Sequence, residues 1–574
     1  MEQIMNHLEA LYGQEAALKY GEQLEARIAA FRKKPQKPRK KELDEGEVVI
    51  ITYGDQFRGR NRTPLQNLKD FSERWLGDLA STLHILPCYP YTSDDGFSVV
   101  DYKQVDPALG TWEDIAEIQS FRLMLDFVCN HISAGSPWFQ AYLRGEAPYD
   151  GFFIETDPAA DLSAVTRPRA LPLLTAFETP AGQKHLWTTF SEDQIDLNFE
   201  NPDVLLAMID VLLFYVEQGA DLLRLDAVGF LWKRVGTACM HLPETHQVIQ
   251  LMKAVLDRTA PEVVLITETN VPHRDNISYF GDGTNEARMV YQFPLPPLTL
   301  YTLLRGDATV LTSWAAGLEA PSEETTFFNF LASHDGVGVN PARGLVPEEE
   351  IQWLIEQVRE RGGLISYKSN PDGSQSAYEM NVSYFDALNR PEEPVDLQVK
   401  RFAAAQAIAL SLAGVPGLYI HSVVGSRNNL EGVSLTGRNR SINREKFERD
   451  ALEQVLQDPD SLRRKVYDAV KALLRVRRRE RAFCPTGGQR VLAWDHRVFA
   501  VLRTSPEGDA AVLALQNITA EAVDLAVSLE ALGLSDQEAQ ELLTGDTVQL
   551  TSGSLKRRVQ PYETVWLKLR GFMI

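Results

Sequence analysis

From residue 47 onward, short apolar segments alternate with longer stretches of helical periodicity, and this alternation strongly constrains how the chain can fold. Parallel strands cannot be joined by hairpins and need helical crossovers of this kind. Parallel strands that are covered on both faces also read as near-continuous runs of Val, Ile and Leu. Eight such segments therefore predict an α/β protein built on a (β/α)8 TIM barrel. They occupy residues 47–53, 81–87, 121–128, 221–228, 262–269, 287–293, 325–335 and 415–422.

Two connections in this pattern are too long for ordinary loops. About 90 residues separate the third and fourth segments, and about 80 separate the seventh and eighth. Connections of that length usually fold as inserted subdomains or lids. We expect a catalytic barrel over 48–480 with an insertion at 132–200 (domain B) and a lid-like insertion at 337–395 (domain B′). Residues 481–574 alternate like short antiparallel strands and predict a C-terminal β domain.

Residues 1–47 precede the barrel as a helical extension and a linker. Leucines near helical spacing predict one amphipathic helix over residues 2–31. The following basic tract, RKKPQKPRKK, contains two prolines and is followed at once by an acidic run. This pattern favours a solvated linker over a basic interaction site.

The overall charge and the cysteine pattern limit the partners and the compartment. The net charge of −21 argues against nucleic acid or an anionic membrane as the main partner. No apolar stretch reaches the length of a membrane span, and the first residues lack a signal-peptide pattern. The four cysteines are scattered, and none forms a C-x-x-C pair. Such usage fits a reducing compartment, so we expect a cytoplasmic protein.

Polar side chains collect at the ends of four predicted strands. The C-terminal strand ends of a TIM barrel form its active-site face. Arg224 and Asp226 are two residues apart and therefore share one face of their strand. Three carboxylates, an arginine and two histidines are thus expected at one mouth. They are His131 after the third strand, Arg224 and Asp226 in the fourth, Glu268 in the fifth, and His334 and Asp335 in the seventh.

Four motifs carry a family resemblance. DFVCNH, LRLDAV, the TET around Glu268 and FLASHD resemble the four signature regions of glycoside hydrolase family 13, the α-amylase superfamily, in the expected order. The resemblance implies that Asp226 is the nucleophile, Glu268 the general acid/base and Asp335 the transition-state stabiliser. Arg224, His131 and His334 would support them. The chemistry is consistent with these roles, because glycosidic cleavage passes through an oxocarbenium-like state that carboxylates stabilise.

A narrower resemblance concerns the donor glucose. YTSDDGFSVVDYKQVDPALGTWED is similar to the sucrose phosphorylase subfamily, which implies that Asp94 and Phe97 clamp the glucose. Arg444 of SINREK matches the arginine that would pair with Asp94. A single glucosyl subsite closed by such a pair suits short glucosides rather than starch.

The same subfamily implies a phosphate site. The motif R-P-R maps to Arg167 and Arg169, and AYEMNVSYFDAL resembles the mobile loop that alternates between acceptor and phosphate. Tyr378 in that loop is a candidate phosphate ligand. Arginine is well suited to phosphate because its donors form a planar fork.

Two departures from the sucrose enzymes concern the acceptor. Asn270 replaces their histidine two places after the acid/base, and Glu379 replaces their mobile-loop glutamine. The pair resembles the branch acting on glucosylglycerol or 2-O-glucosylglycerate. A glycerate carboxylate needs a cation, for which His273 and Arg274 are candidates, although a structural role fits each equally well.

We therefore expect a retaining α-glucoside phosphorylase. It would convert 2-O-α-D-glucosyl-D-glycerate and inorganic phosphate to α-D-glucose 1-phosphate and D-glycerate through a glucosyl-enzyme intermediate. Glucosylglycerol or sucrose 6-phosphate as donor is the alternative on the same scaffold. A hydrolase fits less well because it has no obvious use for R-P-R, and an inactive binding homologue conflicts with the intact carboxylates.

No cofactor or metal is expected. Many amylases bind calcium near the asparagine that matches Asn130, but the phosphorylase branch generally does not. The partners would be the small-molecule glucoside, phosphate and glycerate, with no nucleic acid and no membrane. The sequence is compatible with a homodimer.

Overall fold

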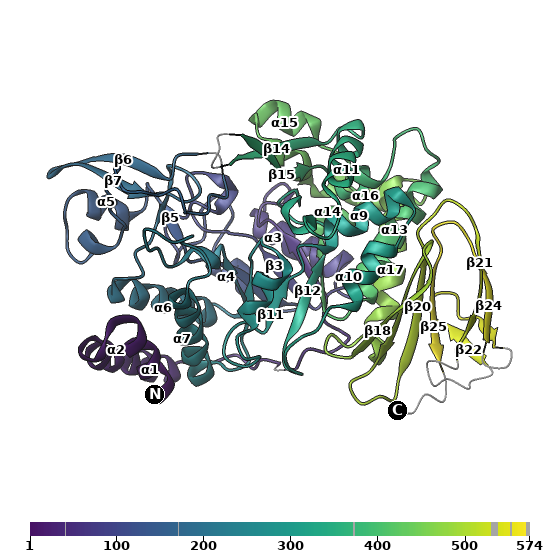
Figure 1. Cartoon of the computed structure of the whole chain (residues 1–574), viewed down its shortest axis with the longest axis horizontal. Coiled ribbons are helices and arrows are strands. Elements are labelled where there is room, and N and C mark those ends of the chain that lie inside the picture. Colours follow the sequence, from purple (N-terminus) through teal and green to yellow (C-terminus); the bar gives the residue numbers. More distant parts are fainter. Residues whose placement is uncertain (41, 170, 371–373, 530–537, 551–553, 570–574) are drawn as a thin grey trace.

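The chain forms a closed barrel of eight parallel strands, as predicted (Figure 1). The computed structural model describes residues 1–40, 42–169, 171–370, 374–529, 538–550 and 554–569. Each barrel strand lies within a predicted segment or begins one residue before it. In the order in which they pair around the barrel, the strands are β1 (Val49–Thr52), β16 (Val415–Tyr419), β12 (Thr326–Phe330), β11 (Met289–Tyr291), β10 (Val264–Thr267), β9 (Ala220–Asp226), β4 (Arg122–Val128) and β3 (Thr82–Ile85).

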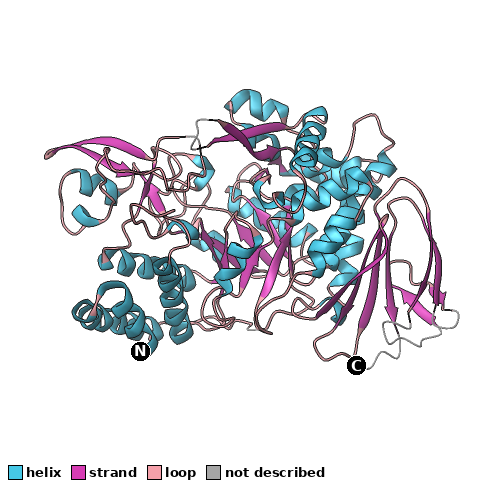
Figure 2. Cartoon of the chain, in the orientation of Figure 1, coloured by secondary structure: helices cyan, strands magenta, loops and turns pink. Residues whose placement is uncertain are grey.

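Helices surround the barrel and cover its outer face (Figure 2). The strands are buried almost throughout because they face side chains inside the barrel and helices outside it; all seven residues of β9 are buried. α6 illustrates how local sequence sets a helix, because Asn201 caps its first turn and Pro202 begins it. The main surrounding helices are α3 (Pro64–Trp75), α4 (Trp112–Ala116), α6 (Pro202–Glu217), α7 (Pro243–Thr259), α9 (Leu295–Arg305), α10 (Thr309–Ala316), α13 (Val395–Ser411) and α17 (Leu462–Arg477).

The two long connections both fold on the same side of the barrel (Figure 1). Between β4 and β9, helix α5 (Pro137–Leu143) accompanies two antiparallel pairs, β5 (His131–Ser133) with β8 (Gln194–Asp196) and β6 (Leu174–Thr179) with β7 (Gly182–Trp187). Between β12 and β16, α11 (Glu348–Glu360) and α12 (Tyr384–Leu388) flank a three-stranded sheet. Its order is β13 (Val337–Gly338), β15 (Gln375–Asn381) and β14 (Leu364–Ser369).

The predicted C-terminal β domain is confirmed as antiparallel sheets. Two fully buried arginines lie where it meets the barrel. Arg477 of α17 donates to five backbone carbonyls, from Glu45 to Phe483. Arg503 donates to three more. The C-terminal strands are β18 (Gly488–Asp495), β19 (Val498–Thr504), β20 (Ala511–Asn517), β21 (Val523–Ser528), β22 (Glu538–Glu541), β23 (Thr547–Gln549), β24 (Ser554–Val559) and β25 (Thr564–Leu569).

The N-terminal region differs from expectation in two ways. Residues 2–31 are not one helix, because the chain breaks at Gly13 (φ 82°) between α1 (Glu2–Tyr12) and α2 (Gln14–Arg32). The basic tract is mostly exposed, as expected of a solvated linker, but it is also bound to the barrel: Lys34 pairs with Glu217 at 2.6 Å and Lys37 with Asp221 at 2.7 Å. The tract therefore binds the junction of α6 and β9. Within the described residues, no helix is both long and apolar enough to cross a membrane.

Candidate active site

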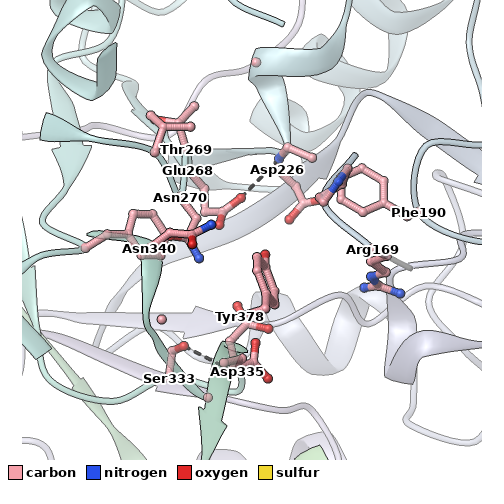
Figure 3. Close-up of a pocket in the computed structure, with 18 of the residues that line it drawn as sticks. Arg169, Phe190, Asp226, Glu268, Thr269, Asn270, Ser333, Asp335, Asn340 and Tyr378 are labelled. Carbon is pink, nitrogen blue, oxygen red and sulfur yellow. Dashed lines mark hydrogen bonds between the residues drawn. The ribbon is translucent and has the colours of Figure 1, made fainter. Parts of the chain in front are cut away.

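A cavity of about 540 Å³ opens at the C-terminal mouth of the barrel. Strand ends form its floor, and both insertions contribute to its walls (Figure 3). Most of the site residues predicted from sequence line this cavity. They are Asp94, Phe97, His131, Arg167, Arg169, Arg224, Asp226, Glu268, Asn270, His334, Asp335, Tyr378 and Glu379. Arg444 does not line it, and neither do His273 and Arg274.

Arg224 anchors the carboxylates on the cavity floor. Its guanidinium donates to Asp226 Oδ1 at 2.8 Å and also to Asp126, while its distance to Glu268 Oε2 is 3.8 Å. Burial raises the pKa of both Asp226 and Glu268, and the negative charge of Glu268 raises that of Asp226 further. The coupled pair therefore retains a proton near neutral pH. Because Arg224 donates a hydrogen bond directly to Asp226, Asp226 is the ionised member of the pair and Glu268 carries the proton.

The residue after Asp226 has an unusual backbone. Ala227 adopts the left-handed conformation (φ 50°, ψ 29°), which is rare for a residue with a Cβ. Its N–H donates to Glu268 Oε2 at 3.2 Å. Residues held in such conformations tend to cluster at functional sites, where the surrounding structure enforces the strain. Here the strained turn links the backbone after Asp226 to the Glu268 carboxyl group (Figure 3).

Arg440, which the sequence analysis missed, joins the third carboxylate to β15 of the second insertion. Its guanidinium lies 2.6 Å from Asp335 Oδ1 and binds Glu379 through two hydrogen bonds of 3.0 and 2.7 Å. Burial alone would raise the pKa of Asp335, but Arg440, His334 and nearby arginines lower it well below its usual range. Asp335 is therefore ionised at neutral pH. The available signal was that Arg440 precedes Arg444 by four residues in RNRSINR.

Two of the histidines that line the cavity, His131 and His334, are uncharged at neutral pH. Burial lowers the pKa of His334 to about 3 and that of His131 to about 4. The His334 ring stacks on Phe97 with centroids 4.8 Å apart, and His131 Nε2 lies 3.0 Å from the Phe97 carbonyl oxygen. Neutral imidazoles can donate hydrogen bonds to sugar hydroxyls without adding charge to the crowded floor.

The expected pairing of Arg444 with Asp94 is wrong. Arg444 pairs with Asp95 and donates to the His334 carbonyl oxygen at 2.8 Å, whereas Asp94 pairs with Arg169 at 2.9 Å. Asp94 and Asp95 both have positive φ, 54° and 50°. The chain thus turns sharply between them, and the two carboxylates reach different arginines.

Arg167 and Arg169, the arginines predicted to bind phosphate, differ in the contacts that hold their side chains. Arg169 is held by Asp94 and lies over the Phe190 ring, 5.5 Å from its centroid. Arg167 is exposed and donates to the Leu171 carbonyl oxygen. In Figure 3, Arg169 and Phe190 lie on the side of the cavity opposite Asn270 and Asn340, with Tyr378 between them.

The acceptor side contains one further residue that sequence reasoning missed. Asn340 lines the cavity together with Asn270, whose buried Oδ1 has no hydrogen-bond partner among the described residues. A buried amide oxygen without a partner is costly unless a ligand or water supplies a donor. Asn340 follows β13 inside the insertion, and no motif in the sequence marked it.

A buried lysine lies where the sequence raised the question of a metal. Lys233 Nζ is 2.7 Å from Asn130 Oδ1 and 2.6 Å from Asp196 Oδ2. Its positive charge therefore joins the end of β4 to β8 of the first insertion. Across the described part of the chain, no group of three His, Cys, Asp or Glu side chains is placed to hold a metal ion.

The fold and the carboxylate-lined mouth are those of α-amylase-type enzymes. The family model described as "Alpha amylase, catalytic domain" matches residues 75–335. Glucosylglycerate phosphorylase of Allomeiothermus silvanus is 50% identical and covers 98% of each chain. The protein of that name from Escherichia coli K12 is 44% identical, covering 99% of this chain and all of that one. The chain therefore belongs to glycoside hydrolase family 13 and, within it, to the glucosylglycerate phosphorylases.

A solved structure supports the same fold. Sucrose 6F-phosphate phosphorylase from Thermoanaerobacter thermosaccharolyticum superposes with a TM-score of 0.73 at 24% identity. The match covers 90% of this chain and 98% of that one. At this identity, the likeness supports the architecture and not the substrate.

Proposed function

We propose that this protein is a retaining phosphorylase that converts 2-O-α-D-glucosyl-D-glycerate and phosphate to α-D-glucose 1-phosphate and D-glycerate. The observation that carries the proposal is 50% identity over nearly the whole chain to a relative of that named activity. Sucrose 6-phosphate and glucosylglycerol remain the alternative donors, since more distant relatives carry those names.

In the first step, an ionised Asp226 oxygen attacks the anomeric carbon and the bond to the glycerate oxygen breaks. Glu268 transfers its proton to that oxygen, so glycerate leaves as the alcohol. The direct hydrogen bond from Arg224 to Asp226 supports this division of roles. Asp335, ionised and held by Arg440, would stabilise the positive charge that develops on the sugar.

In the second step, a phosphate oxygen attacks the anomeric carbon and the ester to Asp226 breaks. Glu268 takes back a proton from the phosphate, which restores the enzyme. Arg167, Arg169 and Tyr378 would bind the phosphate. Asp94, Phe97, His131, His334 and Arg444 would form the glucose site, with Arg444 acting through Asp95. Asn270 and Glu379 would bound the acceptor site.

The wider organisation belongs to the same proposal. The catalytic unit would span 48–480 with insertions at 132–200 and 337–395, preceded by residues 1–47 and followed by residues 481–574. The enzyme would act in the cytoplasm without a cofactor, and a homodimer is compatible with it.

The test is a pair of rate measurements on the purified chain. In the presence of phosphate, glucosylglycerate should yield glucose 1-phosphate in large excess over free glucose. In the reverse direction, glucose 1-phosphate should react faster with D-glycerate than with glycerol, fructose or fructose 6-phosphate. Free glucose as the main product would indicate a hydrolase, and a preference for glycerol or fructose 6-phosphate would move the protein to a neighbouring specificity.

A further inference from the structure

The charges lining the cavity are mostly paired with one another. The reaction must nevertheless bind two anions, phosphate and the glycerate carboxylate, on a protein of net charge −21. Each anion needs a local cation that is not already neutralised. Three of the lining arginines form ion pairs with lining carboxylates: Arg224 with Asp226, Arg169 with Asp94, and Arg440 with Asp335 and Glu379.

Lys368 is a lining cation that remains unpaired. It lies on β14 opposite Ser376 of β15, and its side chain is half-buried at the cavity wall. Its ammonium group forms no ion pair or hydrogen bond with the described residues. Burial lowers the pKa of Lys368, and the charge of Arg343 lowers it further. Keeping a partly desolvated ammonium group charged near a second cation costs free energy, and a bound anion would offset that cost.

Arg343 is this second cation. It also lines the cavity, and it pairs with Glu348 outside the cavity, where both side chains are accessible to solvent. Exposed ion pairs of this kind are weak, so Glu348 offsets the charge of Arg343 only partly. Two positive groups from one insertion therefore line the cavity, and the one carboxylate paired with either of them, Glu348, is accessible to solvent outside it.

We propose, building on the proposed function, that Lys368 with Arg343 binds the carboxylate of the glycerate acceptor. Both belong to the insertion that supplies Asn340, which shares a side of the cavity with Asn270 in Figure 3. The cationic phosphate candidates Arg167 and Arg169 belong to the other insertion, and Arg169 lies across the cavity (Figure 3). The cations for the two anions thus come from different insertions, and the asparagines are left for the acceptor hydroxyls.

The experiment compares acceptors that differ at the carboxylate. Full-length Lys368→Met and Lys368→Arg are assayed with glucose 1-phosphate as donor and either D-glycerate or glycerol as acceptor. Lys400→Met is the matched control, since Lys400 is exposed on α13 and lies outside the cavity. The KM for phosphate is measured separately with α-glucosyl fluoride, a donor without a carboxylate.

Lys368→Met should lower the glycerate-to-glycerol ratio of kcat/KM by about ten- to hundredfold, the usual loss for a hydrogen bond to a charged group. The loss should appear mainly in the KM for glycerate, and Lys368→Arg should recover much of it. Activity with glycerol reports that the variant is folded.

Two results would overturn the inference while the proposed function stood. They are an unchanged ratio in Lys368→Met, and a rise in phosphate KM as large as the rise for glycerate. A wild-type enzyme that does not use glycerate would instead refute the proposed function, and this assignment with it.

Discussion

The Glu268→Gln variant tests the contribution of proton transfer while the geometry of the active site is kept. Glutamine has nearly the same shape as glutamate, and its side-chain oxygen can still accept the Ala227 N–H that lies 3.2 Å from Oε2. Arg224 keeps its direct bond to Asp226 and to Asp126. The substitution therefore removes one transferable proton from an otherwise unchanged cavity floor.

The loss should depend on the leaving group. A positioned general acid contributes about 10²- to 10⁴-fold, or roughly 3–5 kcal/mol of barrier. With glucosylglycerate as donor, the glycerate oxygen must be protonated as it leaves, so this reaction should lose nearly all of the contribution. With glucosyl fluoride, the fluoride leaves without needing a proton in the transition state, so this reaction should be partly spared, because it still uses Asp226, Arg224 and Asp335.

The pH profile supplies a second readout. Burial raises the pKa of Asp226. Glu268 carries its proton, and is therefore uncharged, over the pH range in which Asp226 ionises, so glutamine should leave the acid limb of kcat/KM nearly in place. The basic limb, assigned to loss of the Glu268 proton, should disappear.

The assay measures initial rates of both donors with phosphate between pH 4 and 9, for the wild type and the variant. Equal loss on both donors would refute the acid/base assignment. A basic limb that persists in the variant would refute the assignment of that limb to the Glu268 proton.

Three further substitutions test separate parts of the structure. Asp226→Asn should abolish turnover in both directions, since an amide cannot form the glucosyl ester; a trapped covalent adduct located by mass spectrometry on another residue would contradict this. Arg169→Ala should raise the KM for phosphate more than it slows hydrolysis of the same donor, and an unchanged phosphate KM would remove Arg169 from that site. Arg477→Met leaves up to five buried carbonyls without donors and should destabilise the fold by at least about 3 kcal/mol; calorimetry showing an unchanged melting temperature would contradict the role given to Arg477 at this junction.

The barrel and its floor were predictable because they depend on local pattern. Each strand is a continuous apolar run, and the polar residue ending a barrel strand must lie at the C-terminal mouth. Arg224 and Asp226 share a face because strand side chains alternate, which requires no knowledge of the rest of the chain. These are properties of one segment at a time.

The missed contacts depend on several segments at once. Arg440 joins Asp335 and Glu379, which lie 105 and 61 residues earlier. Asp94 pairs with Arg169 and Asp95 with Arg444 because both aspartates adopt a left-handed backbone conformation, which no sequence motif indicated. Lys368 and Asn340 reach the cavity because the segment between β12 and β16 forms part of its wall. Contacts that depend on the course of long loops cannot be predicted from the periodicity and spacing of residues in the sequence.

The docking of α2 onto the barrel is delayed during synthesis. α2 is made well before its polar partners, because Arg27 binds Asp210 and Glu25 binds Arg258. The helix must therefore wait until about 230 further residues have been translated, which takes roughly 10–50 s at 5–20 residues per second. During that time the face of α2 that later packs against the barrel helices lacks these partners.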